Sequence, residues 1–198
     1  MYVFSLNDPL FLPHVGCDLS FTLREGAGLI LTGENGLGKT TLVRRFHQKF
    51  DKKTSVSFVA QDALRFFYDR KLENFRDIFL QTCGEFINPS LFQKLWQELG
   101  LEGKGPRLLS ELSGGEGQAL KLICGLVKNA EIYILDEPSQ FLDAAKKTYL
   151  QQILREMLNQ KKSLLMVEHD LSWSGGSWEV LELKAIEGSV QECKRWTT

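Results

Sequence analysis

The chain has 198 residues, 43% of them hydrophobic, and a formal net charge of −1 at pH 7. These values are typical of one globular domain with a sizeable core, and they disfavour a protein that binds bulk nucleic acid through a basic surface. No apolar run reaches the ~20 residues that a membrane-spanning helix needs, and no basic-then-apolar leader opens the chain, so we expect a soluble or peripheral protein. The cysteines lack C-x-x-C spacing and a nearby histidine cluster, which predicts reduced thiols rather than a zinc site or disulfides, at Cys17, Cys83, Cys124 and Cys193.

The first part of the chain predicts strands around a glycine-rich loop. Residues 2–6 can form an opening strand, and residues 19–24 alternate apolar and polar side chains, as a half-buried antiparallel strand does. The apolar run 28–32 then leads into the glycine loop, and an amphipathic helix follows from near residue 38 to about residue 50. The order strand, loop, helix therefore places the glycines at the end of a buried strand.

The glycine loop fits the pattern G-x-x-x-x-G-K-[ST], in which backbone N–H groups and a helix N-terminus cradle phosphate. Lys39 is placed to reach the β- and γ-phosphates of a nucleotide, and Thr40 offers a hydroxyl to Mg²⁺. A glycine-rich turn that carries a lysine by accident is the alternative, and the preceding strand disfavours it. The predicted phosphate-binding residues are Gly33, Glu34, Asn35, Gly36, Leu37, Gly38, Lys39, Thr40 and Thr41.

A second buried strand is predicted over residues 55–60, and it ends at Gln61. Strand, helix and strand in this order form the βαβ unit of a parallel sheet. Residues 62–104 change to helical periodicity, which predicts a helical subdomain inserted over about 62–128. The aromatic cluster at residues 66–68 either forms a docking surface or packs inside that subdomain.

Ser113 can cap a helix that runs from Gly114 to about residue 128. The serine and two glycines of the sequence Leu112–Glu116 would make its N-terminus a second anion-binding site. The next strand, residues 131–136, is an apolar run that ends in a carboxylate, as expected where the carboxyl edge of a parallel sheet binds a ligand.

Two acidic residues follow that strand. Asp136 is placed to hold Mg²⁺ and Glu137 to act as a general base on water, although two acids at the end of an apolar run can also be a plain strand boundary. A helix over 143–160, a strand over 163–167 and two weaker strands near 179–184 and 189–192 complete the chain. His169, just after the strand 163–167, would by itself be read as a surface residue.

Together these motifs resemble the ATP-binding subunit of an ABC (ATP-binding cassette) ATPase, over essentially the whole chain. The resemblance implies a single domain over 1–198 of α/β class, with a P-loop NTPase core around a parallel sheet, a small antiparallel β part and an inserted helical subdomain. It further implies the roles of the motifs: residues 33–41 as Walker A, Gln61 as the Q-loop glutamine that contacts Mg²⁺ and γ-phosphate, 112–116 as the signature, 132–136 as Walker B, Glu137 as the catalytic glutamate, 139–143 as the D-loop and His169 as the switch histidine.

In this family the signature of one protomer completes the nucleotide site of the other, so the resemblance implies a homodimer that encloses ATP. The partner's nucleotide would meet Ser113, Gly114 and Gly115. Three features depart from the family: the segment between Lys39 and Gln61 is short, Gln140 and Phe141 stand where small residues are favoured, and Ala119 replaces a common arginine. The adenine-stacking residue by rough spacing is Phe11, with Tyr2, Phe4 and His14 as rivals.

The resemblance implies an ATP hydrolase with ATP and Mg²⁺ as its cofactors. The commonest role in the family is to energise an ABC transporter, which predicts a membrane-spanning permease subunit as partner and a peripheral place on the cytoplasmic face of the cell membrane. The rival is a soluble mechanical ATPase that acts on DNA or ribosomes. Without a heptad insert, a zinc cysteine set, a second cassette or a basic excess, we expect no DNA or RNA partner.

Overall fold

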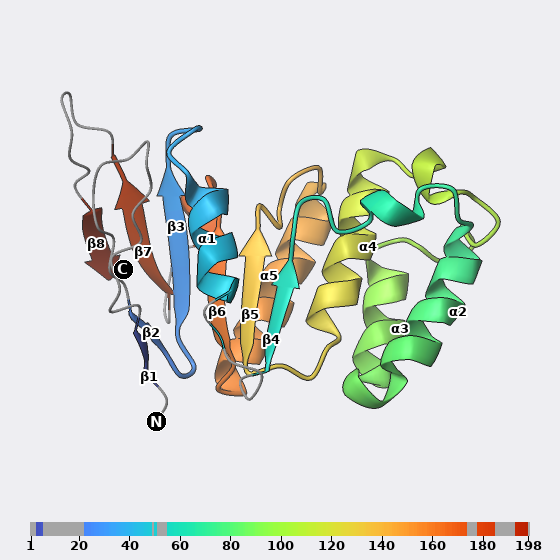
Figure 1. The fold of residues 1–198 in the computed structure, drawn as a ribbon, viewed down its shortest axis with the longest axis horizontal. Helices are drawn as coiled ribbons and strands as arrows, with labels where there is room; N and C mark the ends of the chain where they lie inside the picture. The colour runs from blue at the N-terminus through green and yellow to red at the C-terminus, as the bar shows by residue number, and fades with distance from the viewer. Residues whose placement is uncertain are drawn as a thin grey trace.

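A computed structural model describes residues 3–5, 22–48, 50, 55–173, 178–184 and 193–197. Its centre is a six-stranded sheet of order β4-β5-β6-β3-β7-β8 (Figure 1). The strands are β3 (Gly28–Gly33), β4 (Val56–Val59), β5 (Ile132–Asp136), β6 (Ser163–Val167), β7 (Trp178–Leu183) and β8 (Cys193–Thr197). All neighbours pair in parallel except β7 and β8, which pair antiparallel. This arrangement confirms the predicted α/β fold with a parallel sheet.

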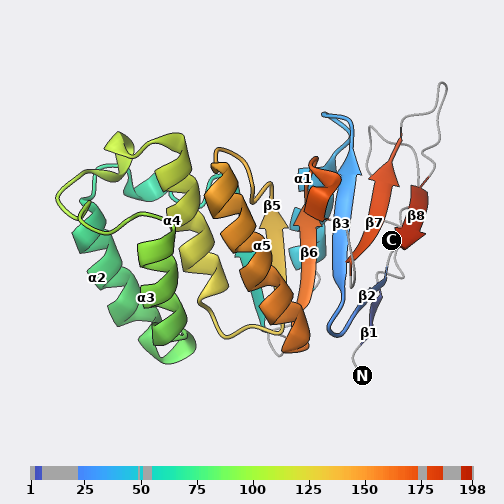
Figure 2. The same ribbon diagram turned by 180° about the vertical axis from the view of Figure 1, so that it is seen from behind.

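The central strands are buried on both faces, because helices cover each side of the sheet. On β5, Ile132 and Ile134 belong to the cluster that includes α1 (Lys39–Gln48), whereas Tyr133 and Leu135 belong to the cluster that includes α5 (Ala144–Asn159). This two-residue period is the pleat of a strand, and it explains why the sequence shows continuous apolar runs rather than alternation. Figures 1 and 2 show α1 and α5 on opposite faces of the sheet.

Beyond β4 the chain forms three further helices, α2 (Leu72–Cys83), α3 (Pro89–Glu98) and α4 (Gly114–Leu126), which lie beside the sheet (Figure 2). Asn88 caps α3, since its side chain accepts a hydrogen bond of 3.0 Å from the N–H of Leu91. A row of aromatic rings packs α2 against α3, with centroid separations of 6.3, 6.2 and 5.3 Å along Phe75, Phe79, Phe92 and Trp96. Single 3₁₀ turns occur at η1 (Arg65–Phe67), η2 (Gly84–Phe86), η3 (Leu109–Glu111) and η4 (Leu171–Trp173).

Most sequence-based boundaries agree with the structure to within two residues, and the terminal strands differ. A separate antiparallel pair consists of β1 (Val3–Ser5) and β2 (Thr22–Arg24), which confirms the predicted small antiparallel part. The final strand is β8 at residues 193–197, whereas the strand expected at 189–192 lies outside the described residues. Within the described ranges, no helix has the length and apolar character that crossing a bilayer requires.

Helix α4 approaches β4 very closely at Gly125. A Cβ on Gly125 would lie 2.1 Å from Cγ2 of Val59, and the Ser57 hydroxyl donates a hydrogen bond of 2.8 Å to the Gly125 carbonyl oxygen. Ser57 and Gly125 are both buried. The glycine therefore sets the distance between the helix and the edge of the sheet.

We expect Gly125→Ala to lower the free energy of unfolding by about 1–3 kcal/mol, because a stiff valine side chain in a close-packed core has to move. Gly117→Ala, on the same helix, is the matched control: a Cβ there meets no atom within 4 Å, so the substitution should be neutral or stabilise by up to ~1 kcal/mol. Urea denaturation of both variants measures the difference. Equal stability of the two would contradict the close approach, and Val59→Ala should restore part of the loss in Gly125→Ala.

Candidate functional site

The predicted site residues gather where β3, β5 and β6 end, at the upper edge of the sheet in Figure 1. The glycine loop leaves β3 and enters α1 at this edge. Gly33 has a φ of +132°, and a Cβ there would lie 2.3 Å from the Leu183 carbonyl oxygen, so the start of the loop packs against β7. Gly36 has a φ of +85°, and a Cβ there would meet no atom within 4 Å, so its backbone conformation rather than a lack of space favours glycine.

Lys39 opens α1 and is 6% exposed. Its ammonium donates hydrogen bonds of 2.7 Å to the carbonyl oxygens of Gly33 and Glu34, so the lysine lies across its own loop. Burial lowers the pKa of Lys39, and the nearby carboxylates of Glu137 and Asp136 oppose that effect. The positive charge is thus held beside the loop by two carbonyl oxygens, with no direct ion pair among the described residues.

Asp136 ends β5 and is 3% exposed. Its Oδ1 accepts a hydrogen bond of 3.1 Å from the Thr40 hydroxyl, while the buried Oδ2 has no hydrogen-bond partner among the described residues. Burial raises the pKa of Asp136, and the Thr40 bond lowers it. A carboxylate oxygen and a hydroxyl side by side are ligands that Mg²⁺ prefers, and Oδ2 keeps an unused acceptor among the described residues, so the chemistry of these residues fits that ion.

Glu137 follows in a left-handed conformation with a φ of +51°, which is uncommon for a residue other than glycine. Its carboxylate Oε1 lies 3.9 Å from Nε2 of His169, which comes from the loop after β6. The structure thus brings together two residues that the sequence separates. Their side chains are 23% and 44% exposed, so both are open to water.

The buried Glu168 holds the two loops against each other, and sequence reasoning missed it. Its Oε1 accepts a 2.8 Å hydrogen bond from the N–H of His169, and its Oε2 accepts a 3.3 Å bond from the N–H of Ser139. The sequence does show a carboxylate at this position, directly after a buried strand. The prediction gave a role only to the neighbouring His169.

Gln118, on α4, is the second residue that the sequence did not indicate. It is 2% exposed, and its side-chain amide donates hydrogen bonds of 3.0 and 3.1 Å to the carbonyl oxygens of Glu137 and Pro138. A glutamine within a helix carries no local sign of such a distant partner.

Ser113 is the N-cap of α4, as predicted. Its hydroxyl accepts a 3.3 Å hydrogen bond from the N–H of Glu116, whose Oε2 accepts a 2.7 Å bond from the Ser113 N–H. This reciprocal pair is a capping box. Glu116 is also bonded to Lys104 and lies 3.2 Å from Arg107.

The two glycines after Ser113 lie beside the loop of Phe141, whose side chain is 67% exposed. A Cβ on Gly114 would lie 3.3 Å from Cγ of the Phe141 ring, and one on Gly115 would lie 2.7 Å from the Phe141 carbonyl oxygen. Without Cβ atoms, both positions leave room for this loop. The N-termini of α1 and α4 lie at the same edge of the molecule, on either side of β4 and β5 (Figure 1).

Among the described residues, no hydrogen bond joins Gln61 to Asp136. The carbonyl oxygen of Gln61 accepts a 3.0 Å hydrogen bond from Nζ of Lys121, and Gln61 lines a cavity of 380 Å³ together with Ser113, Gln118 and Phe141. Thr41 is exposed, and Leu37 is partly buried against the α1 cluster. Phe11, Tyr2 and His14 lie outside the described residues, and of Phe4 only the backbone is described.

Comparison with known proteins shows which families and proteins this chain is similar to. The family model described as "ABC transporter" matches residues 17–140. The zinc import ATP-binding protein ZnuC of Rickettsia conorii is 33% identical over 164 residues, which cover 78% of this chain and 69% of that protein. Translation initiation factor RLI1 of Saccharomyces cerevisiae is 32% identical over 150 residues, which cover 72% of this chain.

Several relatives are much longer than this chain. The match spans 24% of RLI1 and 40% of an ABC transporter ATP-binding protein of Clostridium tetani, which is 29% identical over 180 residues. Among solved structures, an ATP-binding subunit of an ABC transporter has a TM-score of 0.76 at 16% identity, covering 98% of this chain and 90% of its own. A dimeric bacterial ABC transporter cassette has a TM-score of 0.69 at 18% identity, covering 90% and 89%. At these identities, the two structures show that the chain shares their fold.

The capping box at Ser113 predicts a pH-dependent contribution to stability. The bond with Lys104 is the main reason that the pKa of Glu116 falls from an ordinary 4.5 to about 2, and the Ser113 bonds add to it against the effect of burial. A carboxylate with a lowered folded-state pKa stabilises the fold above its unfolded pKa, and that stability is lost as pH falls through the folded pKa.

We therefore expect Glu116→Gln to lower the free energy of unfolding at pH 7. The difference from wild type should shrink below about pH 4.5, because the carboxyl group then takes up a proton in the unfolded chain but not yet in the folded one, where its pKa is about 2. Glu85→Gln, which changes an exposed carboxylate, should show no such loss. Urea denaturation between pH 7 and 3 measures both. A Glu116→Gln difference that stays constant over this range would contradict the assigned interactions.

Proposed function

The chain belongs to the ABC transporter family, and on this basis we propose that it binds and hydrolyses ATP with Mg²⁺ and drives a membrane transporter as a nucleotide-sandwich dimer. The observation that carries the proposal is the meeting of three groups at one sheet edge: the buried Lys39 ammonium, the Thr40 hydroxyl and the unpartnered oxygen of Asp136. This combination serves the binding of a metal–triphosphate complex, and a structural ion pair would not leave the aspartate oxygen without a partner.

Lys39 and the loop N–H groups of residues 33–41 would bind the phosphates. The Lys39 ammonium now bonds to two carbonyl oxygens, which are neutral acceptors, and phosphate oxygens carry charge and make stronger bonds. The N-terminus of α1 adds its partial positive charge at the same place. Phe11 remains the proposed adenine-stacking residue.

Thr40 and Asp136 would hold Mg²⁺, with Gln61 as a third contact. When bound, this ion neutralises charge on the β- and γ-phosphates. Glu137 then accepts a proton from the attacking water as general base, and the His169 imidazole, 3.9 Å from the Glu137 carboxylate, orients that water. Glu168 keeps both loops in register through its bonds to Ser139 and His169.

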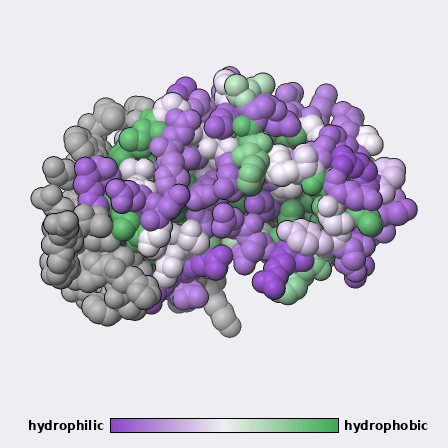
Figure 3. Space-filling model, turned by 90° about the horizontal axis from the view of Figure 1, so that it is seen from above, coloured by the Kyte–Doolittle hydropathy of each residue, from purple (hydrophilic) through white to green (hydrophobic). Residues whose placement is uncertain are grey.

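The second nucleotide contact would come from another copy of the chain. Ser113, Gly114 and Gly115 lie at the N-terminus of α4, and the side chains of this edge are predominantly hydrophilic in Figure 3, as a surface that closes on a charged nucleotide requires. Ser113 and Gly114 are exposed, so a partner's γ-phosphate can reach them.

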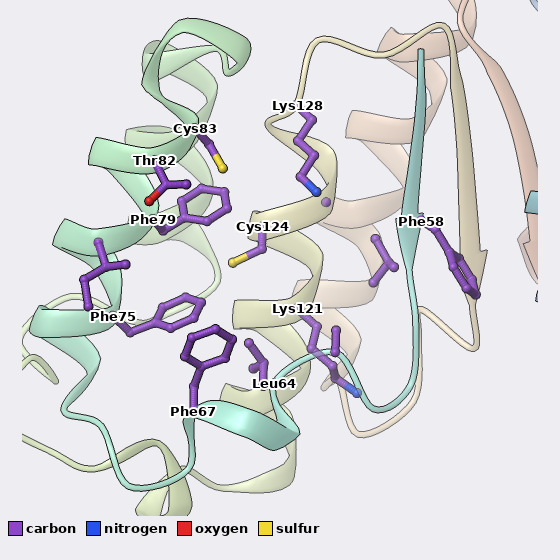
Figure 4. A pocket seen from close by; sticks show the side chains of 14 residues that line it. Phe58, Leu64, Phe67, Phe75, Phe79, Thr82, Cys83, Lys121, Cys124 and Lys128 are labelled. Carbon is purple, nitrogen blue, oxygen red and sulfur yellow. The ribbon is translucent and has the colours of Figure 1, made fainter. Parts of the chain in front are cut away.

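The permease subunit would dock on the helices beside β4, which we propose to be a subdomain of about 62–128 within a single domain over 1–198. A cavity of 330 Å³ lies there between α2, α4 and β4, lined by aromatic side chains that include Phe67, Phe75 and Phe79 (Figure 4). Phe66 and Tyr68 next to it are 85% and 53% exposed. This partner would place the chain on the cytoplasmic face of the cell membrane.

A soluble ATPase acting on ribosomes is the second candidate function. It is favoured by the similarity to RLI1 and by a TM-score of 0.69 with an archaeal ribosome recycling factor, at 23% identity over 88% of this chain and 35% of that protein. ATPase stimulation by ribosomes, with no response to membrane fractions, would support this candidate over transport.

Replacing the proposed base tests the nucleotide site. Glu137→Gln keeps the size of the side chain but cannot take a proton, so we expect hydrolysis to fall by roughly 10²- to 10⁴-fold while ATP still binds. The variant should be monomeric alone and dimeric on gel filtration with ATP and Mg²⁺, because bound ATP favours the closed pair. Adding Ser113→Arg should abolish the dimer.

Lys39→Ala is the control for the site itself, since it removes the charge at the β/γ-phosphates and should abolish hydrolysis and weaken ATP binding. Normal turnover in Lys39→Ala would refute the nucleotide site. A Glu137→Gln variant that binds ATP normally yet stays monomeric at high protein concentration would refute the sandwich dimer.

A photocrosslinking residue in place of Ile78, which is 41% exposed and lines the cavity, tests the docking surface. We expect a crosslink to a protein with several membrane-spanning helices in intact membranes. The same residue in place of Arg155, exposed on α5, should give none. A ribosomal product from position 78 would favour the second candidate, and equal products at both positions would contradict docking at the cavity.

A further inference from the structure

We propose that Gln118 is a positioning residue for the carboxylate of Glu137, and that it acts by fixing the backbone that carries this side chain. The inference rests on the proposed function, in which Glu137 is the general base. It assigns a role in the reaction to a helix residue that does not touch the nucleotide.

The first observation is the pair of hydrogen bonds that Gln118 donates. Its Nε2 lies 3.0 Å from the Glu137 carbonyl oxygen and 3.1 Å from that of Pro138. A primary amide has two N–H donors, and both are used here on consecutive carbonyl groups. Its acceptor Oε1 is buried with no hydrogen-bond partner among the described residues. Gln118 therefore acts here through its N–H groups. A residue at this position needs two donors to bond both carbonyl oxygens at once.

The second observation is the conformation that these bonds hold. Glu137 has a φ of +51°, a region that a side chain with a Cβ adopts only when its surroundings enforce it. Its N–H donates a 3.0 Å hydrogen bond to the Val167 carbonyl oxygen, which fixes one side of the residue. On the other side, the Glu137 carbonyl oxygen accepts bonds from Gln118 and, at 3.2 Å, from the Gln140 N–H, and Gln118 also bonds to the next carbonyl oxygen, that of Pro138. Released from these bonds, the backbone can relax toward common φ values, and the carboxylate would turn with it.

The third observation is that Gln118 itself is rigidly placed. It is 2% exposed, in the second turn of a helix whose nearby N-terminus is fixed by the capping box. A side chain held in this way can serve as a reference point for the catalytic loop. A displacement of about 1 Å at a reacting group can cost on the order of 10²-fold in rate, so a small release is sufficient to be measured.

Gln118→Met tests the inference, because methionine has a similar length and no donor. We expect kcat to fall by roughly 10- to 100-fold while the affinity for ATP changes by less than about 3-fold. Gln118→Ala is the second variant and opens space where water can replace the amide. Ser57→Ala is the matched control: it removes a buried bond between α4 and the sheet far from Glu137, and it should leave kcat unchanged at a similar cost in stability.

The deciding experiment is a double-mutant cycle with Glu137→Gln. The rate of single-turnover hydrolysis is measured for the wild type, the two single variants and the double variant. If Gln118 acts through the Glu137 carboxylate, Gln118→Met should change the residual rate of the Glu137→Gln variant by less than about 2-fold, because residues that act as a unit are not additive. A purely structural contribution would lower the rate by the same factor in both backgrounds.

Three outcomes would overturn the inference while leaving the proposed function intact: an unchanged kcat in Gln118→Met, the same factor in both backgrounds, or a loss of ATP binding parallel to the loss of kcat. Unfolding of both Gln118 variants, with Ser57→Ala folded, would assign a structural role and would also overturn it. A wild-type chain that hydrolyses no ATP would instead refute the proposed function, and the inference with it.

Discussion

The burial of two opposite charges at the carboxyl edge of the sheet is the constraint on which the site depends. Lys39 and Asp136 are 6% and 3% exposed, and no direct ion pair joins them. Buried charges are costly unless polar partners surround them, so the fold supplies neutral ones: two loop carbonyl groups for the ammonium and the Thr40 hydroxyl for the carboxylate. Each charge thereby keeps bonding capacity for a ligand of opposite sign.

The elements around this edge are the ones that the sequence predicted best. The strands β3, β5 and β6 are short, mostly apolar runs buried on both faces, and such runs are visible locally because consecutive positions are apolar. The cap at Ser113 was equally readable, since an N-cap side chain bonds to the N–H only three residues ahead. The glycine loop could be read for the same reason, because its chemistry lies within one continuous segment.

The residues that the sequence did not reveal act over long distances in the chain. Gln118 reaches carbonyl groups at 137 and 138, Glu168 reaches the N–H of Ser139, and Ser57 reaches the carbonyl of Gly125. No local periodicity distinguishes these side chains from ordinary helix or strand residues. The strand β8 at residues 193–197 was also not predicted, because it pairs antiparallel with β7 at the edge of the sheet and carries a polar sequence without a clear apolar run.

The glycine pair at 114 and 115 shows how one sequence feature can satisfy two physical requirements. A Cβ on Gly115 would lie 2.7 Å from the Phe141 carbonyl oxygen, which is backbone and cannot rotate away, so glycine at 115 is needed for the loop to pack whether or not a phosphate ever reaches it. A Cβ on Gly114 would meet the Phe141 ring at 3.3 Å, a tight contact with a side chain. Phe141 has a φ of +63°, an unusual conformation for a bulky residue, and the missing Cβ atoms give it the space for that conformation. The packing requirement of the loop and the proposed need for close phosphate approach therefore select the same residue type. Within one chain, glycine at these positions is therefore not by itself evidence for a phosphate.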